Sequence, residues 1–241
     1  MVTGAGKGIG RQISLDLAKN GAFVVAISRS TEDLKSLQEQ IQQMGKTCKM
    51  IQADLGNVEE CKRAATEAAQ LDIDLLVNNA GISKMGLLVD LTVEDWDAVL
   101  NVNLRAVFII SQIISKGMIK RRKGAIVNIS SQASSVGLEK HSSYCASKGA
   151  LDQLTRVMSL ELGKHNIRVN AVNPTVVLTD MGKTAWSDPK RSGPMLAQIP
   201  LGRFAEPSDV SEAVLFLLSP KASMINGITL PIDGGFLASK L

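Results

Sequence analysis

Tyr144 and Lys148 are four residues apart, the spacing at which two side chains share one face of a helix. A free tyrosine titrates at about pH 10, and a cation one turn away would stabilise its phenolate and lower the pKa. Such a tyrosine can donate a proton to a carbonyl oxygen. Ser131, thirteen residues before the single tyrosine of the chain, can hydrogen-bond the same oxygen and stabilise its developing charge. Together the three side chains predict carbonyl reduction, although Ser131 by itself would also suit a turn or a helix cap.

A glycine-rich segment at residues 3–10 has the residue types that hold phosphate groups. Glycines let the backbone turn tightly and approach a pyrophosphate, and the N-terminus of a following helix supplies amide donors. The order Gly-x-x-x-Gly-x-Gly is wider than the usual Rossmann fingerprint. A glycine-rich turn is also a common link between strand and helix, but its place after the first expected strand favours a dinucleotide. The predicted cofactor-binding residues here are Gly4, Lys7, Gly8, Ile9 and Gly10.

The residues after the second expected strand indicate which dinucleotide is bound. NAD-binding folds usually place a carboxylate there, which accepts a hydrogen bond from the ribose 2′-hydroxyl. This chain has Ser28 and Arg29 at that point, and its first acid is Glu32. Arg29 can bind a 2′-phosphate through two hydrogen bonds, and Lys7 can approach the same group. We therefore predict NADPH as the cofactor; the alternative is that both cations are solvated surface residues.

These residues must be positioned by a chain that alternates short β-branched runs with amphipathic segments. The runs are near-continuously apolar, as strands buried on both faces of a parallel sheet require. They cover residues 23–27, 48–52, 75–77, 125–129 and 168–172, and the helical patterns cover roughly 8–20, 31–43, 57–70, 92–117 and 143–163. The alternation predicts an α/β fold with a single Rossmann-like, doubly wound parallel sheet flanked by helices, in one domain, 1–241. Such sheets bind ligands at the carboxyl ends of their strands, where Ser131 and the glycine turn also fall.

The first strand of this sheet is expected to be short. Three residues precede Gly4, whereas a strand averages about 5–6 residues. The sequence therefore predicts a first strand that is truncated at the N-terminus. We expect either that the chain is a shortened form of a longer parent or that the flanking strands compensate for the missing ladder.

The composition of the 241-residue chain is that of an ordinary globular protein, with 45% hydrophobic and 21% charged residues. The net charge of +4 is modest and the basic residues are scattered, which argues against a nucleic-acid binder. Three cysteines without paired spacing and two histidines argue against a zinc site and a disulfide scaffold. No apolar run reaches about 18 residues, so we expect no membrane span, and the start shows no leader peptide.

The C-terminal tripeptide Ser239-Lys240-Leu241 has the form of a peroxisomal targeting signal. Three specified residues at the extreme terminus seldom occur together by chance, so we expect a peroxisomal location. The alternative is a chance polar tail on a cytoplasmic protein.

The order and spacing of these motifs resemble those of the short-chain dehydrogenase/reductase family across essentially the whole chain. Besides the glycine turn, Ser131 and Tyr144-x-x-x-Lys148, the matching residues are Asn78-Asn79-Ala80-Gly81, Asn103 and Asn173-Pro174. The resemblance implies that Tyr144 is the general acid/base and that Ser131 orients the carbonyl. It also implies that Lys148 binds the nicotinamide ribose and lowers the tyrosine pKa, and that Asn103 holds a water linking Lys148 to solvent.

The same resemblance assigns further residues to the cofactor. They are Asp54 and Leu55 at the adenine; Asn78, Ala80 and Gly81 along the ribose and the centre of the sheet; and Pro174, the Val177 backbone and the Thr179 hydroxyl near the nicotinamide carboxamide. Thr175 stands where the family commonly has a glycine, which puts the local turn at variance with the common pattern.

Finer stretches resemble one subgroup of the family, which reduces small sugar ketones and α-dicarbonyls. These stretches are residues 4–11, 103–107, 170–177, 185–189 and 199–202. This resemblance implies NADPH-dependent reduction of L-xylulose to xylitol, with diacetyl as a further substrate, by a homotetramer. Gln132, His141 and Trp186 would then line the substrate pocket together with Ser131 and Tyr144. Gln132 and His141 could supply the hydrogen bonds that a sugar ketone needs, and Trp186 could close the pocket from a mobile loop.

Two other functions stay open at this point. One is a peroxisomal carbonyl reductase for retinoid, steroid or aromatic ketones. The segment 181–201, which we expect to form a lid over the pocket, carries few large apolar residues and suits small polar substrates better. The other is a protein that senses NADPH and regulates a partner without turnover. Loss of a catalytic residue would mark such a sensor, and none is lost here.

Overall fold

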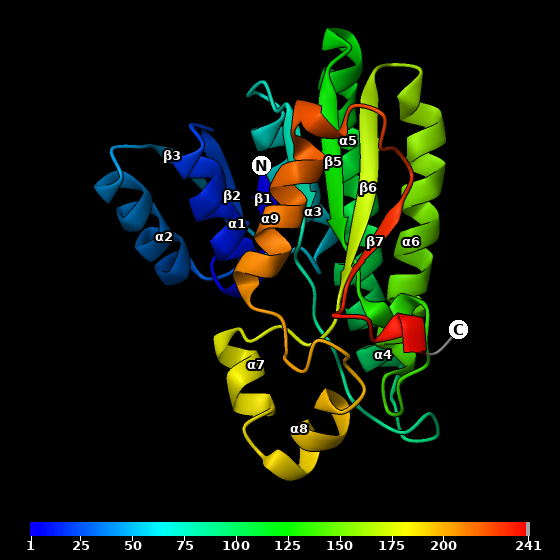
Figure 1. Cartoon of the computed structure of the whole chain (residues 1–241). Helices are drawn as coiled ribbons and strands as arrows, with labels where there is room; N and C mark the ends of the chain where they lie inside the picture. The colour runs from blue at the N-terminus through cyan, green and yellow to red at the C-terminus, as the bar shows by residue number, and fades with distance from the viewer. Residues whose placement is uncertain (240–241) are drawn as a thin grey trace.

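The computed structural model describes residues 1–239, and within them a parallel sheet of seven strands forms the centre of the molecule (Figure 1). The strand order is β3-β2-β1-β4-β5-β6-β7, so the direction of winding reverses between β1 and β4. The strands are β1 (Val2–Thr3), β2 (Val24–Ser28), β3 (Cys48–Gln52), β4 (Leu75–Asn78), β5 (Gly124–Ile129), β6 (Ile167–Pro174) and β7 (Thr229–Ile232). This confirms the doubly wound α/β fold, whose ligands bind at the carboxyl ends of the strands near such a reversal.

Helices cover both faces of the sheet, and each face has its own core. One face carries α1 (Gly8–Lys19), α2 (Thr31–Gln43) and α9 (Pro207–Leu218), and the other carries α3 (Val58–Ala68), α5 (Ala106–Arg121) and α6 (Ser142–Gly163) (Figure 1). Side chains alternate along each strand: in β2, Val25 and Ile27 join the core under α3 and α5, whereas Val24 and Ala26 join the core under α1 and α2. Each large aliphatic side chain buried in this way stabilises the fold by about 1.5–3 kcal/mol.

Several elements lie outside the set expected from the sequence. They are β7, α9 and the two helices α7 (Asp180–Ala185) and α8 (Pro189–Leu196). β7 contains Pro231 and forms an edge of the sheet, where a missing N–H is tolerated. α9 starts at Pro207 after a capping box between Glu206 and Asp209, a start signal that its own sequence carries.

The single helix expected over 92–117 consists of three parts. α4 (Val93–Leu100) continues through a π-helical turn, η1 (Asn101–Arg105), into α5. The continuous helix from Val93 to Arg121 is long and apolar enough to cross a membrane, but half of its most apolar window is buried inside the protein. Ala106, Ile109, Ile110, Ile114 and Met118 of this helix belong to the core under α3, so packing accounts for much of its apolar character.

The first strand is short, as expected, and is nevertheless held by both neighbours. Val2 pairs with Ala26 of β2 and with Val77 of β4. Where β1 ends, the Thr3 hydroxyl accepts hydrogen bonds from the backbone N–H groups of Asn79, at 2.9 Å, and Ala80, at 3.1 Å. These bonds continue the link between β1 and β4 beyond the single Val2–Val77 pair.

The lid, residues 181–201, extends beyond the carboxyl ends of the strands and contains most of α7 and all of α8 (Figure 1). It therefore lies at the edge of the sheet where the site is expected. Of the predicted targeting tripeptide, Lys240 and Leu241 lie outside the described residues.

Candidate active site

Tyr144, Lys148 and Ser131 meet at the carboxyl end of β5. Tyr144 lies in the first turn of α6, and Lys148 lies one turn further along the same face. Ser131 follows β5 and caps a short 3-10 turn, η2 (Gln132–Ser134), and its hydroxyl is placed to hydrogen-bond that of Tyr144. The Lys148 Nζ donates to the Ile129 carbonyl at 2.7 Å and lies 5.6 Å from the centre of the Tyr144 ring. The structure thus brings together the three residues predicted to reduce a carbonyl.

Burial sets the proton affinities of this group. Lys148 is 4% exposed, and desolvation lowers its pKa to about 8, although the Asp152 carboxylate opposes the shift. Burial also raises the pKa of Tyr144, and the hydrogen bond with Ser131 offsets that rise only in part. Desolvation is thus the largest influence on the Tyr144 pKa in the protein alone, and the lowering of that pKa by Lys148 stays a prediction. The raised pKa keeps Tyr144 protonated at neutral pH, as a proton donor requires.

Asn103 lies at the centre of η1 and is fully buried. Its side chain makes two bonds with the Ile82 backbone, accepting from the N–H at 2.8 Å and donating to the carbonyl at 2.9 Å. A side chain on Gly81 would come within 3.4 Å of the Asn103 Oδ1 and 3.7 Å of the Lys148 Nζ, so both groups border one narrow space. A π turn leaves a backbone carbonyl without its usual helical partner, which suits the predicted role of holding a water beside Lys148.

The glycine turn lies between β1 and α1, at the centre of the sheet. Gly4 and Gly8 have φ angles of +62° and +55°, a left-handed conformation that favours glycine. A side chain on Gly4 would meet the Ala80 backbone, and one on Gly8 would meet Thr179. Two further segments predicted to bind the cofactor therefore lie against the glycine turn. α1 has no side-chain cap, whereas α2, α3 and α4 are capped by side chains. The free amide groups at its N-terminus, within which Ile9 and Gly10 lie, fit a pyrophosphate.

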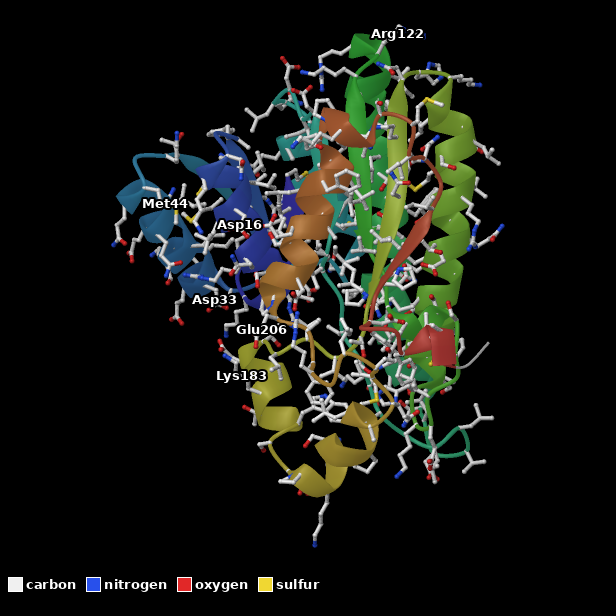
Figure 2. All side chains as sticks on the ribbon, viewed as in Figure 1. Asp16, Asp33, Met44, Arg122, Lys183 and Glu206 are labelled. Carbon is white, nitrogen blue, oxygen red and sulfur yellow. The ribbon has the colours of Figure 1, made fainter. Side chains whose placement is uncertain are left out.

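Arg29 supplies the cation expected at a 2′-phosphate, whereas Lys7 is already paired. Arg29 follows β2, is exposed, and forms no ion pair with the residues that the structure describes. The Lys7 Nζ lies 3.3 Å from the Asp33 Oδ2. Both Asp33 and Ser28 border the glycine turn, and Figure 2 shows Asp33 at the end of α2 that points toward α7. The sequence alone does not place Asp33 beside the glycine turn, because its position there depends on where α2 begins.

Three predicted cofactor residues use their side chains in the fold. Asn78 is buried, and its Nδ2 donates to the Ser111 hydroxyl at 3.0 Å and to the Asn128 Oδ1 at 2.8 Å. Leu55 belongs to the core under α3 and α5. The Asp54 Oδ1 accepts from a backbone N–H two residues on, at 2.9 Å. We therefore expect these positions to border a dinucleotide chiefly through their backbone.

Pro174 ends β6, and the chain then passes Val177 and Thr179 on its way into α7. Val177 forms an isolated parallel bridge with Ala205, which holds this segment in place. The Thr179 hydroxyl accepts from the Gly182 N–H at 3.1 Å and so caps α7. A capping hydroxyl keeps its own proton, so Thr179 can still donate to a carboxamide oxygen.

Gln132 and His141 lie beside the Ser131–Tyr144 pair. Gln132 follows Ser131 directly and is 3% exposed, and its Oε1 is buried without a hydrogen-bond partner in the described part of the chain. His141 precedes α6, and its ring centre is 6.3 Å from that of Tyr144. Its Nδ1 lies 2.7 Å from the Glu139 carbonyl oxygen, a contact that fixes the ring. His141 is therefore close enough to the tyrosine to border a substrate, and the same role for Gln132 stays a prediction.

Trp186 directly follows α7 and belongs to a third apolar cluster, between the lid and the body of the protein. Its ring centre is 5.4 Å from that of Phe204, and the Arg191 guanidinium lies 5.8 Å above it. The cluster also includes Leu196 of α8 and Val136, just after η2. The underside of the lid is thus more apolar than its sequence suggests, and it connects Trp186 to the turn that carries the substrate residues.

Comparisons with known proteins agree with this geometry. A family model described as enoyl-(acyl carrier protein) reductase matches residues 4–237. L-xylulose reductase of Mesocricetus auratus is 52% identical over 240 residues, which are 99% of this chain and 96% of that protein. The chain belongs to this family, the short-chain dehydrogenases/reductases. D-erythrulose reductase of Gallus gallus is 48% identical over 240 residues, 99% of this chain and 95% of that protein.

The fold of this short-chain dehydrogenase/reductase also matches solved structures. A gluconate 5-dehydrogenase from Burkholderia cenocepacia J2315, crystallised in complex with NADP and tartrate, superposes with a TM-score of 0.92 at 31% identity. The match covers 98% of this chain and 93% of that one.

Two supporting contacts of this short-chain dehydrogenase/reductase were not expected from its motifs. The Asn79 Nδ2 donates to the Thr3 carbonyl at 2.9 Å and to the Gly4 carbonyl at 3.2 Å, and so ties the glycine turn to β4. Asp152 and Asn173 form a hydrogen-bonded, buried pair behind Ser131. The one sequence signal for Asp152 is its spacing of four residues from Lys148, which continues the same helix face.

Proposed function

We propose that the chain is an NADPH-dependent carbonyl reductase of small polar ketones, which reduces L-xylulose to xylitol and also reduces α-dicarbonyls such as diacetyl. The observation that carries the proposal is the meeting of Ser131 and Tyr144 at the carboxyl end of β5, with the buried Lys148 cation 5.6 Å from the centre of the Tyr144 ring. This arrangement is suited to protonating a carbonyl oxygen held between two hydroxyl groups. The names of two relatives, L-xylulose reductase and D-erythrulose reductase, support a small polar ketone as substrate.

The residues present fit NADPH. The glycine turn and the uncapped N-terminus of α1 would hold its pyrophosphate, Arg29 its 2′-phosphate, and Lys148 its nicotinamide ribose. When bound, NADPH supplies the hydride for the carbonyl carbon. The gluconate 5-dehydrogenase structure, which contains NADP, supports this cofactor.

The protein's own residues handle the proton. Tyr144 donates its hydroxyl proton to the carbonyl oxygen, and the Ser131 hydroxyl hydrogen-bonds the same oxygen while negative charge develops there. Lys148 is positively charged below its pKa of about 8 and stabilises the phenolate that proton transfer leaves behind. A water held at η1, in the space that Asn103 shares with Lys148, would supply the replacement proton from solvent.

The unpaired Gln132 Oε1 favours a substrate that carries hydroxyl groups. A buried acceptor without a partner costs about 1–3 kcal/mol, so a ligand that donates to it gains that energy on binding. A ketose has such donors next to its carbonyl group. The His141 ring, whose centre is 6.3 Å from that of Tyr144, offers a second polar contact.

Replacement of Gln132 by methionine tests this contact. Gln132→Met is expected to raise the KM for L-xylulose about tenfold and to leave the KM for diacetyl unchanged, because diacetyl has no hydroxyl to donate. Steady-state kinetics with the two substrates checks the prediction, and the melting temperature should not fall, because the variant loses an unpaired buried oxygen. An equal loss with both substrates would assign Gln132 to the support of the Ser131 turn instead.

A second candidate is a carbonyl reductase for retinoid, steroid or aromatic ketones. The apolar underside of the lid favours it, since Trp186, Leu178 and Val136 could pack against a hydrophobic ring. Faster turnover of a retinal-like ketone than of L-xylulose would make this the better assignment.

A homotetramer is the proposed assembly. Helices α5 and α6, on one face of the sheet, expose apolar side chains: Phe108 is 49% exposed, Val157 41% and Leu160 79%. Exposed apolar groups gathered on one face mark protein contacts. We expect light scattering to give four times the chain mass of 25.7 kDa.

A charge placed on this face is expected to break the assembly. Leu160→Glu should elute as a smaller species in size-exclusion chromatography, because association would bury the new carboxylate. Met44→Glu is the matched control, because Met44 lies at the far end of α2, away from α6 (Figure 2). A monomeric wild type would contradict the tetramer, and a tetrameric Leu160→Glu would place the interface away from this face.

Peroxisomal import is proposed on the form of the tripeptide Ser239-Lys240-Leu241. A fluorescent protein fused to the N-terminus is expected to bring the chain to a peroxisomal marker, and removal of the three residues should make the signal diffuse. A diffuse signal from the intact fusion would favour the cytoplasmic alternative.

A further inference from the structure

A buried carboxylate lies behind the site, and none of the steps above uses it. Asp152 is on α6, one turn after Lys148, and is 5% exposed. Its Oδ2 accepts a hydrogen bond from the Asn173 Nδ2 at 2.8 Å, whereas its Oδ1 has no hydrogen-bond partner within residues 1–239. A buried carboxylate is costly unless a donor and a nearby cation compensate for its lost hydration. The contacts of Asp152 show what compensates for it.

Asn173 connects the carboxylate to the turn that carries Ser131. It is 2% exposed at the carboxyl end of β6, and its Nδ2 donates to the Ser134 hydroxyl at 2.8 Å and to the Ser131 carbonyl at 3.2 Å, besides Asp152. An amide nitrogen has two protons, so three acceptors share them, and the charged acceptor attracts them most strongly. Asp152 therefore orients the amide that holds both Ser131 and Ser134 in place.

Asp152 is also the charged side chain that acts on Lys148. The carboxylate raises the Lys148 pKa against the desolvation that lowers it to about 8. The other groups that border Lys148 carry no charge at neutral pH: Gly81, Asn103 of η1, the Ile129 carbonyl of β5, and the Tyr144 phenol. Without Asp152, desolvation would act on the ammonium group unopposed.

We propose that Asp152 is a positioning residue of the reduction: through Asn173 it holds the Ser131 turn, and through its charge it keeps Lys148 protonated. This inference deepens the proposed function and rests on it. A residue that served only the fold would change stability and overall rate without moving the pH at which activity is lost.

The pH dependence of diacetyl reduction by charge-neutral variants tests this role. Lys148 must be protonated, so activity is present below its pKa and is lost as the pH rises through it. Asp152→Asn keeps the shape of the side chain but lowers that pKa, so the alkaline limb of kcat/KM is expected to move down by about one pH unit. Asp152→Glu keeps the charge and should hold the limb near its wild-type position. Glu161→Gln, an exposed change of the same kind on α6, is the matched control and should not move it.

The same shift is expected in the pH dependence of NADPH binding, followed by cofactor fluorescence. This second readout needs no turnover, so an inactive wild type would refute the proposed function and leave the Asp152 shift measurable. An Asp152→Asn limb that coincides with the wild-type limb in both readouts would overturn the inference. If that variant does not fold, Asp152→Ser removes the same charge in a smaller side chain. Failure of both neutral variants to fold would also overturn it, because Asp152 would then serve the fold.

Discussion

Tyr144→Phe is expected to lower the rate of carbonyl reduction by about 10²- to 10⁴-fold and to leave the NADPH dissociation constant close to its wild-type value. The change removes the phenol oxygen with its proton and keeps the ring that packs against His141 and beside Lys148. The carbonyl oxygen then keeps the hydrogen bond from Ser131 but has no proton donor. Single-turnover kinetics at saturating NADPH measures the effect on the chemical step.

The titration of Tyr144 can be followed separately, because it is the single tyrosine of the chain. The ultraviolet absorbance of tyrosinate therefore reports this residue alone. Since burial raises the pKa of Tyr144, the folded protein is expected to titrate above the ordinary value of about 10. A rate that falls less than about tenfold in Tyr144→Phe would show that the proton comes from another group.

Arg29→Asp is expected to raise the NADPH dissociation constant by about 100-fold. Arg29 is exposed at the carboxyl end of β2 without an ion-pair partner in the described residues, whereas the nearby Lys7 is paired with Asp33. The substitution removes the charge-assisted bonds to the 2′-phosphate and replaces attraction by repulsion. NADH has a hydroxyl at that position, so its affinity should change little. Fluorescence titration with the two cofactors measures both constants.

A matched control for this change is Lys46→Asp, an equal change of charge just beyond the opposite end of α2, which should alter neither constant. Salt offers a second check, because ions screen an exposed arginine and should weaken NADPH binding more in the wild type than in Arg29→Asp. Equal losses for NADPH and NADH would indicate a distorted glycine turn and would contradict the assignment of Arg29 to the 2′-phosphate.

Local sequence signals predict the fold well, and the interactions between distant segments poorly. Strands β2 to β6 and helices α1, α2, α3 and α6 agree with the expected ranges to within a few residues, because β-branched runs and amphipathic periods are local. β7 was not predicted because it contains Pro231 and because its formation depends on pairing with β6. The lid helices were not predicted because α7 has six residues, and because α8 is mostly polar and contains Pro194.

The candidate site divides in the same way. Tyr144, Lys148 and Ser131 could be placed because one helix turn and one strand end position them. The direction of the pKa shifts of Tyr144 and Lys148 could not be predicted, since both shifts follow mainly from burial. Asp152 and its partner Asn173 are 21 residues apart and meet only once α6 packs on β6.

The most direct test of the account follows NADPH oxidation by the wild type with L-xylulose, diacetyl, erythrulose and a retinal-like ketone, with Tyr144→Phe measured in parallel. The account predicts rapid oxidation with the small polar carbonyls, xylitol as the product from L-xylulose, and loss of turnover in the variant. Tight NADPH binding without turnover of any of these carbonyls would contradict it and would favour a protein that senses the cofactor.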